Sequence, residues 1–136
     1  MRYLIDTTIL VDMVTDDYIS NNVRSVIADY ENIIYVSSES VKEFIHLIQI
    51  KRIIPTKPVS MLNVFDFIEN ELGFTVKYIE KSHLQTFAKI DLVEGHNDPS
   101  DRLIIAQAMT EKLPLISSDK KFPKYIKMGL DFISNY

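Results

Sequence analysis

The sequence predicts an α/β protein with a central, mainly parallel β-sheet. Short apolar runs of strand length alternate along the chain with longer segments of helical period, which is typical of that class. The run at residues 113–116 is continuously apolar, as expected for a strand covered on both faces. At 136 residues, with 46% hydrophobic and 25% charged side chains, the chain fits one globular domain spanning residues 1–136.

The first part of the chain predicts a strand, two short helices, a second strand and a long helix, over residues 2–5, 8–14, 21–30, 32–37 and 38–54. The second strand rests on the β-branched and aromatic run from Ile33 to Val36. Apolar residues at helical spacing from Val41 to Ile48 mark one face of the long helix. Ser40 followed by Glu43 resembles a capping box, and Pro55 with Pro58 is expected to end this helix.

The second part predicts a helix, a strand, a helix, a loop, a helix and two strands, over residues 59–72, 74–78, 81–90, 91–97, 98–112, 113–116 and 130–133. Gly73 is expected to stop the first of these helices. Pro99 suits the first position of the helix that Asp98 opens, because a proline there loses no helical hydrogen bond.

Charge and composition exclude several classes of site. With no cysteine, the chain has no disulfide, thiolate zinc site or cysteine nucleophile, which is consistent with a cytoplasmic protein. Asp6 interrupts the N-terminal apolar run, and no apolar segment approaches the roughly 20 residues of a membrane span, so we expect no membrane association. The net charge of -4 argues mildly against a nucleic-acid binder, although bound metal ions can supply local positive charge.

Two aspartates follow predicted parallel strands. Asp6 ends the first strand and Asp119 follows residues 113–116, so both belong at the carboxyl edge of the sheet, where ligands bind. Each also has a structural interpretation: Asp6 as the cap of the next helix and Asp119 as a turn residue.

Glu43 and Asp101 lie on or beside apolar helix faces, where an uncompensated carboxylate is costly. Asp98 is the best candidate for a helix cap, and Asp101 could complete a capping box with it. If Asp6, Glu43, Asp101 and Asp119 converge, their repulsion calls for cations, and oxygen-only ligands suit Mg²⁺ or Mn²⁺. That chemistry supports phosphodiester hydrolysis.

Four segments together resemble the PIN-domain ribonucleases, especially the VapC-like toxins of bacterial and archaeal toxin–antitoxin pairs. Residues 3–8 are similar to the family's first strand and its catalytic Asp-Thr, here Asp6 and Thr7. Residues 37–43 are similar to the motif that carries the catalytic Glu, and residues 115–119 to the last motif. The run from His96 through Arg102 matches the His-x-Asp-Pro-x-Asp-Arg stretch of one branch, and this is the most specific of the four.

The resemblance implies a PIN-like α/β/α sandwich and a Mg²⁺- or Mn²⁺-dependent endoribonuclease acting on RNA. It also implies a homodimer and a cognate antitoxin that blocks the site. The residues it implies as metal ligands are Asp6, Glu43, Asp101 and Asp119. Asp98, Thr7 and Ser117 are accessory. Ser100 and Ser117 depart from the aromatic residue and the threonine that are common at those positions. His96 is interpreted as structural, although it lies beside the third motif and could touch substrate.

Other interpretations remain open. Asp6 as a phosphatase nucleophile is weakened by Thr8, because those enzymes carry a second acid at that position. A housekeeping RNA-processing nuclease and a catalytically silent RNA- or partner-binding module both fit the same four motifs.

Overall fold

A computed structural model describes residues 1–136 and contains one sheet of five parallel strands. The strands are β1 (Arg2–Ile5), β2 (Ile33–Ser37), β3 (Thr75–Lys77), β4 (Leu115–Ser117) and β5 (Phe132–Ser134). Their order across the sheet is β3-β2-β1-β4-β5, so β1 lies at the centre. The predicted α/β class with a parallel sheet is confirmed.

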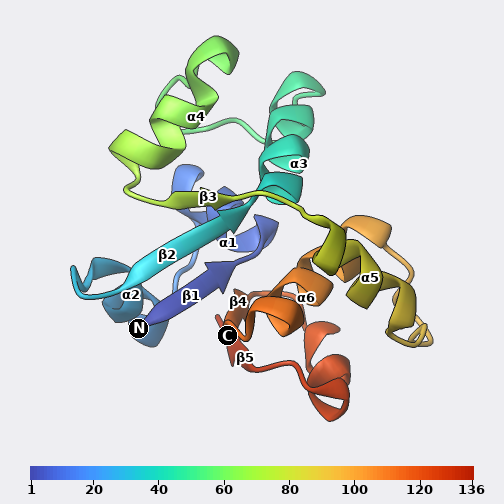
Figure 1. Cartoon of the computed structure of the whole chain (residues 1–136). Helices are drawn as coiled ribbons and strands as arrows, with labels where there is room; N and C mark the ends of the chain where they lie inside the picture. The colour runs from blue at the N-terminus through green and yellow to red at the C-terminus, as the bar shows by residue number, and fades with distance from the viewer.

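Helices cover both faces of this sheet (Figure 1). The α-helices are α1 (Thr7–Val14), α2 (Asn21–Ala28), α3 (Ser38–Gln49), α4 (Val64–Asp66), α5 (Lys81–Lys89) and α6 (Pro99–Glu111). Three other helical segments are η1 (Met61–Asn63), η2 (Phe67–Glu71) and η3 (Phe122–Met128), of which η2 is a π-helix and the others are 3₁₀. None of the helices is long and apolar enough to cross a membrane.

The two faces of the sheet carry separate apolar clusters, as strand geometry requires. Leu4 packs with residues of α6 and η3, whereas Ile5, the next residue, packs with residues of α1, α2 and α3. Leu115 and Ile116 of β4 divide between the clusters in the same way. Successive side chains of a strand point to opposite faces, so each buried strand contributes to both layers of helices.

The helices begin where the sequence offers a cap. The side chain of Asp98 accepts a hydrogen bond from the Asp101 N–H, and Pro99 occupies the first turn of α6, as predicted. Asp6 caps α1 in the same manner through the Ile9 N–H. The cap of α3 is Ser37, which accepts from the Glu39 N–H, so the proposed capping box of Ser40 and Glu43 is wrong.

The long helix predicted over 38–54 ends five residues early. Lys51 adopts a left-handed backbone with φ of 60°, which an α-helix cannot continue through, and the chain leaves the helix at Ile50. Pro55 and Pro58 therefore lie beyond the end and do not cause it. The helix predicted over 21–30 likewise ends at Ala28, where Asp29 turns to an extended backbone.

The predicted helix over 59–72 is a composite of η1, α4 and η2. Its last turn is π-helical because the Leu72 N–H bonds to the Phe67 carbonyl, and Gly73, with φ of 75°, ends it as predicted. The 3₁₀ helix η3 was not anticipated. The last strand starts two residues later than expected. Leu130 is buried, but its N–H donates to the Tyr125 carbonyl at the end of η3 and therefore does not pair with a strand.

Candidate active site

The register of the parallel sheet brings three polar residues to one level. Ile5 of β1 lies opposite Val36 of β2 and Ile116 of β4. The residues that follow, Asp6, Ser37 and Ser117, therefore leave the carboxyl edge of the sheet together. The α1 and α3 helices start there, so the functional side chains come from the strand ends and first turns of these helices.

Asp6 is buried at the carboxyl edge of the sheet, and its relative exposure is only 1%. Its Oδ1 accepts hydrogen bonds from the Thr8 hydroxyl at 2.6 Å and from the Ile9 N–H at 3.3 Å. Its Oδ2 accepts from the Ser117 hydroxyl at 2.7 Å. Burial raises the pKa of Asp6 to about 7 despite these donors. Asp6 is therefore the cap of α1 that the structural interpretation predicts, and its buried carboxylate lies at the carboxyl edge of the sheet.

Thr7 connects Asp6 to the helix that carries Glu43. Its hydroxyl donates to Glu43 Oε1 at 2.7 Å and lies 3.1 Å from Ser40 Oγ. Because Thr7 and Ser40 are both buried, they fix the rotamer of a half-buried carboxylate. Burial raises the pKa of Glu43, and the negative charges of Asp101 and Asp98 raise it further.

Asp101, in the first turn of α6, is the point where the acidic residues meet. Carboxylate oxygens of Glu43, Asp98 and Asp101 lie within 4.8 Å of one another, and a second group within that limit joins His96, Asp101 and Asp119. Burial and the charge of Asp98 raise the pKa of Asp101. Asp98 therefore combines its capping role with a place in the acidic cluster.

Two serines that depart from the family pattern have partners here. Ser100 donates to Glu39 Oε1 at 2.7 Å and so connects the start of α6 to α3. Ser117, besides holding Asp6, accepts a hydrogen bond from the Asp119 N–H at 2.9 Å. Its hydroxyl thus contacts both aspartates that follow the central strands.

A pocket of about 300 Å³ opens beside these acids. It is lined by Thr7, Thr8, Val11, Asp12, Glu43, Leu47, Asp101 and Asp119. Three of the four predicted site acids reach it, whereas Asp6 lies beneath and is absent from both acidic groups given above. The structure thus brings Glu43, Asp101 and Asp119 together around one opening and places Asp6 under it.

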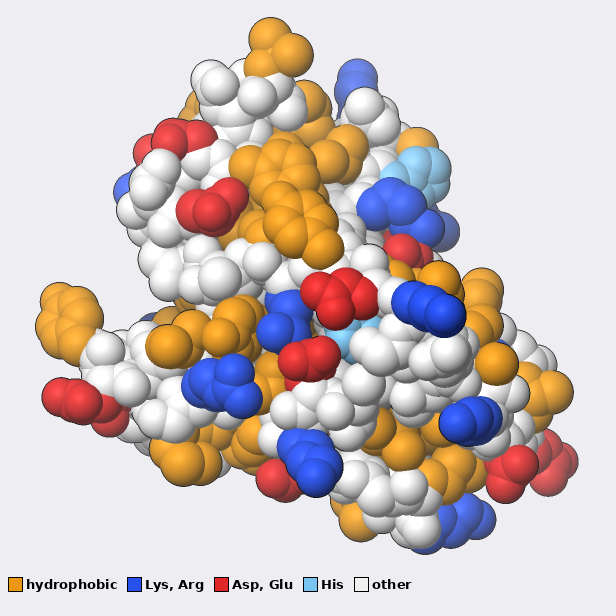
Figure 2. Space-filling model, viewed as in Figure 1, with side chains coloured by type: hydrophobic (Ala, Val, Ile, Leu, Met, Phe, Trp, Pro, Cys, Tyr) orange, Lys and Arg blue, Asp and Glu red, His pale blue; other side chains and the backbone are white.

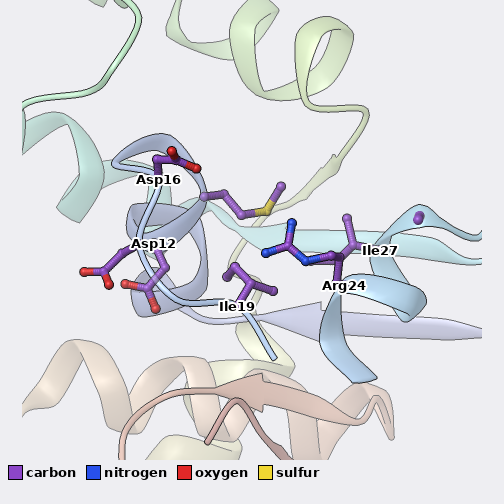
Figure 3. Close-up of a pocket in the computed structure, with 8 residues that line it drawn as sticks. Asp12, Asp16, Ile19, Arg24 and Ile27 are labelled. Atoms are coloured by element: carbon purple, nitrogen blue, oxygen red, sulfur yellow. The ribbon is translucent and has the colours of Figure 1, made fainter. Parts of the chain in front are cut away.

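Sequence reasoning missed Asp12, which accepts a hydrogen bond from the Ser118 hydroxyl at 3.0 Å and whose pKa is raised by burial. The signal was present, because Thr8 and Asp12 lie four residues apart and share a face of α1. Asp12 also lines a neighbouring cavity of about 210 Å³ between α1 and α2, into which Arg24 reaches from α2 (Figure 3).

The donor set fits a hard divalent cation. All the carboxylates that line the pocket are oxygen ligands. Burial and neighbouring negative charges raise the pKa values of Glu43 and Asp101, and a nearby positive charge would favour the ionised form of both. The two groups that share Asp101, one with Glu43 and Asp98 and the other with His96 and Asp119, each have ligand atoms close enough together that they could hold an ion. Asp6 has both carboxylate oxygens engaged by the chain, and binding through it requires an exchange of at least one of these hydrogen bonds.

A third group, outside the candidate site, has its polar atoms paired within the protein. Glu80, His83 and Glu111 gather where α5 begins and α6 ends. Figure 2 shows acidic, basic and histidine side chains close together near the centre of the face in view. His83 Nδ1 accepts from the Glu80 N–H at 2.9 Å, and its Nε2 lies 2.8 Å from Glu111. Lys77 pairs with Glu111 at 3.3 Å. Both ring nitrogens of His83 are thus occupied, and the group forms part of the packing of α5 on α6.

Comparison with solved structures identifies the same fold in several VapBC structures. The chain is similar to DNA-bound VapBC from Salmonella typhimurium, with a TM-score of 0.71, 13% identity and coverage of 100% and 99% of the two chains. It is similar to VapBC2 from Rickettsia felis, at 0.67, 16%, and 98% of each chain. A third, VapBC-5 of a toxin–antitoxin family from Mycobacterium tuberculosis, gives 0.60, 13%, and coverage of 98% and 96%.

No curated protein matches the chain in sequence. The family model for the PIN domain matches residues 3–127, which include every acidic residue of the candidate site. The sandwich of helices around a parallel sheet and the acids at its carboxyl edge agree with that match, and the chain belongs to the PIN domain family.

Proposed function

We propose that this chain is a Mg²⁺- or Mn²⁺-dependent endoribonuclease that hydrolyses RNA phosphodiester bonds. The observation that carries the proposal is the position of Asp101, whose carboxylate lies within one cluster with Glu43 and Asp98 and within another with Asp119. Acidic groups this close, two of which (Glu43 and Asp101) have pKa values raised by burial, are suited to holding divalent cations at an open pocket.

Asp6, Glu43, Asp101 and Asp119 are the proposed metal-binding and catalytic carboxylates, and Asp98, Thr7 and Ser117 are accessory. When bound, the metal supplies Lewis acidity that activates water and stabilises charge on the phosphate. Thr7 holds Glu43, and Ser117 holds Asp6 together with the Asp119 backbone, so the chain fixes its ligands before substrate arrives. The exposed Lys120 and Lys121 follow Asp119 directly and attract the substrate's phosphates.

The biological role that we propose is that of a toxin. The similar folds found in a toxin–antitoxin system of Mycobacterium tuberculosis and in VapBC complexes support this role. In this proposal residues 1–136 form a single domain that acts in the cytoplasm as a homodimer and is inhibited by a cognate antitoxin protein. Light scattering of the purified chain measures the oligomeric state, and a dimer mass is the expected result.

The test of the activity compares cleavage of a pool of structured RNAs by three proteins: the wild type, Asp101→Asn and Asp131→Asn. Asp131 is exposed and lies outside the site, so it provides a matched control for the loss of one charge. We expect the wild type and Asp131→Asn to cleave RNA with Mn²⁺ and to lose cleavage with EDTA, and Asp101→Asn to be inactive under both conditions. Equal cleavage by Asp101→Asn contradicts the proposed site.

Two alternatives have different outcomes. A catalytically silent RNA-binding module retains RNA equally well with Mn²⁺ and with EDTA and cleaves none. A housekeeping RNA-processing nuclease cleaves RNA, but its induced expression without a partner leaves growth unchanged. Growth arrest that requires Asp101 is the result expected of a toxin, and harmless expression of an active enzyme contradicts that role.

A further inference from the structure

His96 is the only histidine of the third motif, and it is almost completely buried, at 3% exposure. It lies in the loop between α5 and α6 and contacts η3, a segment that no sequence motif marked. Its ring lies edge-on against Phe122 and Tyr125, with ring centroids 5.8 Å and 5.4 Å away. Both aromatic residues have no exposed surface, so the ring has a single available orientation in this packing.

Both nitrogen atoms of the His96 ring are engaged. Nε2 lies 3.2 Å from Asp101 Oδ2, and Nδ1 lies 2.6 Å from the Tyr125 hydroxyl oxygen. An ionised carboxylate only accepts hydrogen bonds, so Nε2 carries a proton and donates it to Asp101. In a neutral ring Nδ1 is then the acceptor, and the Tyr125 O–H donates to it. The tyrosine hydroxyl therefore complements the tautomer that Asp101 requires, because it donates to Nδ1 while Nε2 donates to Asp101.

The His96 contact engages Oδ2 of Asp101. Asp101 is the residue shared by the group with Glu43 and Asp98 and the group with Asp119. With Oδ2 held from the protein side, rotation of the Asp101 carboxylate is restricted, and the same side chain lines the pocket. Hydrogen bonds of this kind, from a buried side chain to a metal-binding carboxylate, orient the ligand and tune its affinity for the ion.

We propose that His96 and Tyr125 form a positioning pair that presents Asp101 to the metal, in which the Tyr125 hydroxyl donates to Nδ1 and so stabilises the Nε2–H tautomer of His96. This inference rests on the proposed metal-dependent nuclease, because Asp101 has to be a ligand for its orientation to matter. His96 touches neither the metal nor the RNA in this arrangement, and it acts through Asp101.

The test uses Tyr125→Phe, which removes one buried hydroxyl and keeps the ring that packs on His96. His96→Gln keeps an N–H donor for Asp101, whereas His96→Leu removes it. The matched controls are Tyr3→Phe, on the half-buried tyrosine of β1, and His83→Gln, on a buried histidine that also contacts a carboxylate. Its partner Glu111 is ten residues along α6 from Asp101, or about 15 Å.

Binding of Mn²⁺ is measured by titration calorimetry at a temperature where every variant is folded by circular dichroism. We expect Tyr125→Phe and His96→Leu to bind Mn²⁺ at least about tenfold more weakly than the wild type, with His96→Gln in between. Cleavage kinetics should show kcat reduced and KM for RNA unchanged. The ¹⁵N NMR signals of His96 should report an Nε2–H tautomer in the wild type and a mixture in Tyr125→Phe. Both controls should match the wild type.

The outcomes distinguish the positioning role of His96 and Tyr125 from the metal-binding role of Asp101. If Asp101→Asn loses Mn²⁺ binding while Tyr125→Phe and His96→Leu keep wild-type affinity, the metal site stands and the positioning role is refuted. If Asp101→Asn binds Mn²⁺ as well as the wild type, the proposed metal site itself fails. A loss of affinity in His83→Gln equal to that in His96→Gln also refutes the inference, because the effect is then a general one of altering a buried histidine.

Discussion

Replacement of Asp6 by asparagine should make the metal-free protein more stable at neutral and alkaline pH. Asp6 is buried, and its pKa rises from 3.8 to about 7 on folding. Between these values the native state keeps a proton that the unfolded chain has released, so the free energy of unfolding falls as pH rises. At 1.36 kcal/mol per pKa unit, the loss is complete above the folded pKa and reaches about 4 kcal/mol.

Asparagine fits the same place without titrating. The hydroxyls of Thr8 and Ser117 now donate to Asp6, and either can rotate to accept from an amide N–H. The stability of Asp6→Asn relative to the wild type should therefore increase between about pH 4 and about pH 7 and level off above this range, by up to about 4 kcal/mol. The raised pKa values of Glu43 and Asp101 act in the same direction, but they are present in both proteins and cancel in the comparison.

Urea unfolding followed by circular dichroism, in EDTA and at a series of pH values, measures this difference directly. Asp131→Asn, at an exposed position, should follow the wild-type curve throughout. Parallel pH dependence in the wild type and Asp6→Asn would refute the reasoning, because the buried carboxylate would then not be responsible for the slope. Saturating Mn²⁺ should reverse the order of stability above about pH 7, since an ion that binds only the native state stabilises the charged form.

Three further changes test individual contacts by urea unfolding. Asp98→Ala removes the cap of α6 and should cost about 1 kcal/mol, whereas Asp98→Asn keeps an acceptor and should cost much less; equal costs contradict the capping role. Ser117→Ala leaves Asp6 and the Asp119 N–H without a shared partner and should cost about 1–3 kcal/mol. Ser117→Thr should retain most of that stability, and a loss as large as that of alanine contradicts the hydroxyl's role. Ile105→Ala in the fully buried face of α6 should cost about 2–5 kcal/mol, and Ile126→Ala, at a half-exposed site, far less; similar losses contradict the assigned core.

Sequence patterns predicted those features of the fold whose physical cause lies within a few residues. The strand at residues 2–5, the proline at the start of α6 and the glycine that ends η2 were predicted because hydrophobic run length, fixed proline geometry and glycine's freedom at positive φ act within a few residues. The end of α3 was missed because Lys51 adopts a left-handed backbone, which a lysine rarely does and no sequence pattern signals.

The positions of some acids of the candidate site were predicted because they also follow from local patterns. Asp6 and Asp119 follow strands, so their place at the carboxyl edge follows from the order of elements. Asp101 was singled out by its position on the apolar face of a helix. Asp12 was missed although it shares a face of α1 with Thr8, because that spacing does not reveal its hydrogen bond with Ser118, which is 106 residues away in the chain. Contacts over such separations arise only when the sheet aligns the strands that carry them.

The sequence by itself determined the class of fold, the elements that hold the acids and the family resemblance, since these depend on periodicity and on the order of short motifs. The tertiary structure decided which acids share one opening, that Asp6 lies beneath it with both oxygens engaged, and that Tyr125 holds His96 against Asp101. These relations depend on the strand register and on the packing of η3 against α6. The distances between the site side chains and their burial are defined only when segments remote in sequence pack together. They determine which carboxylate oxygen accepts a hydrogen bond from each hydroxyl and how far each carboxyl pKa shifts on folding.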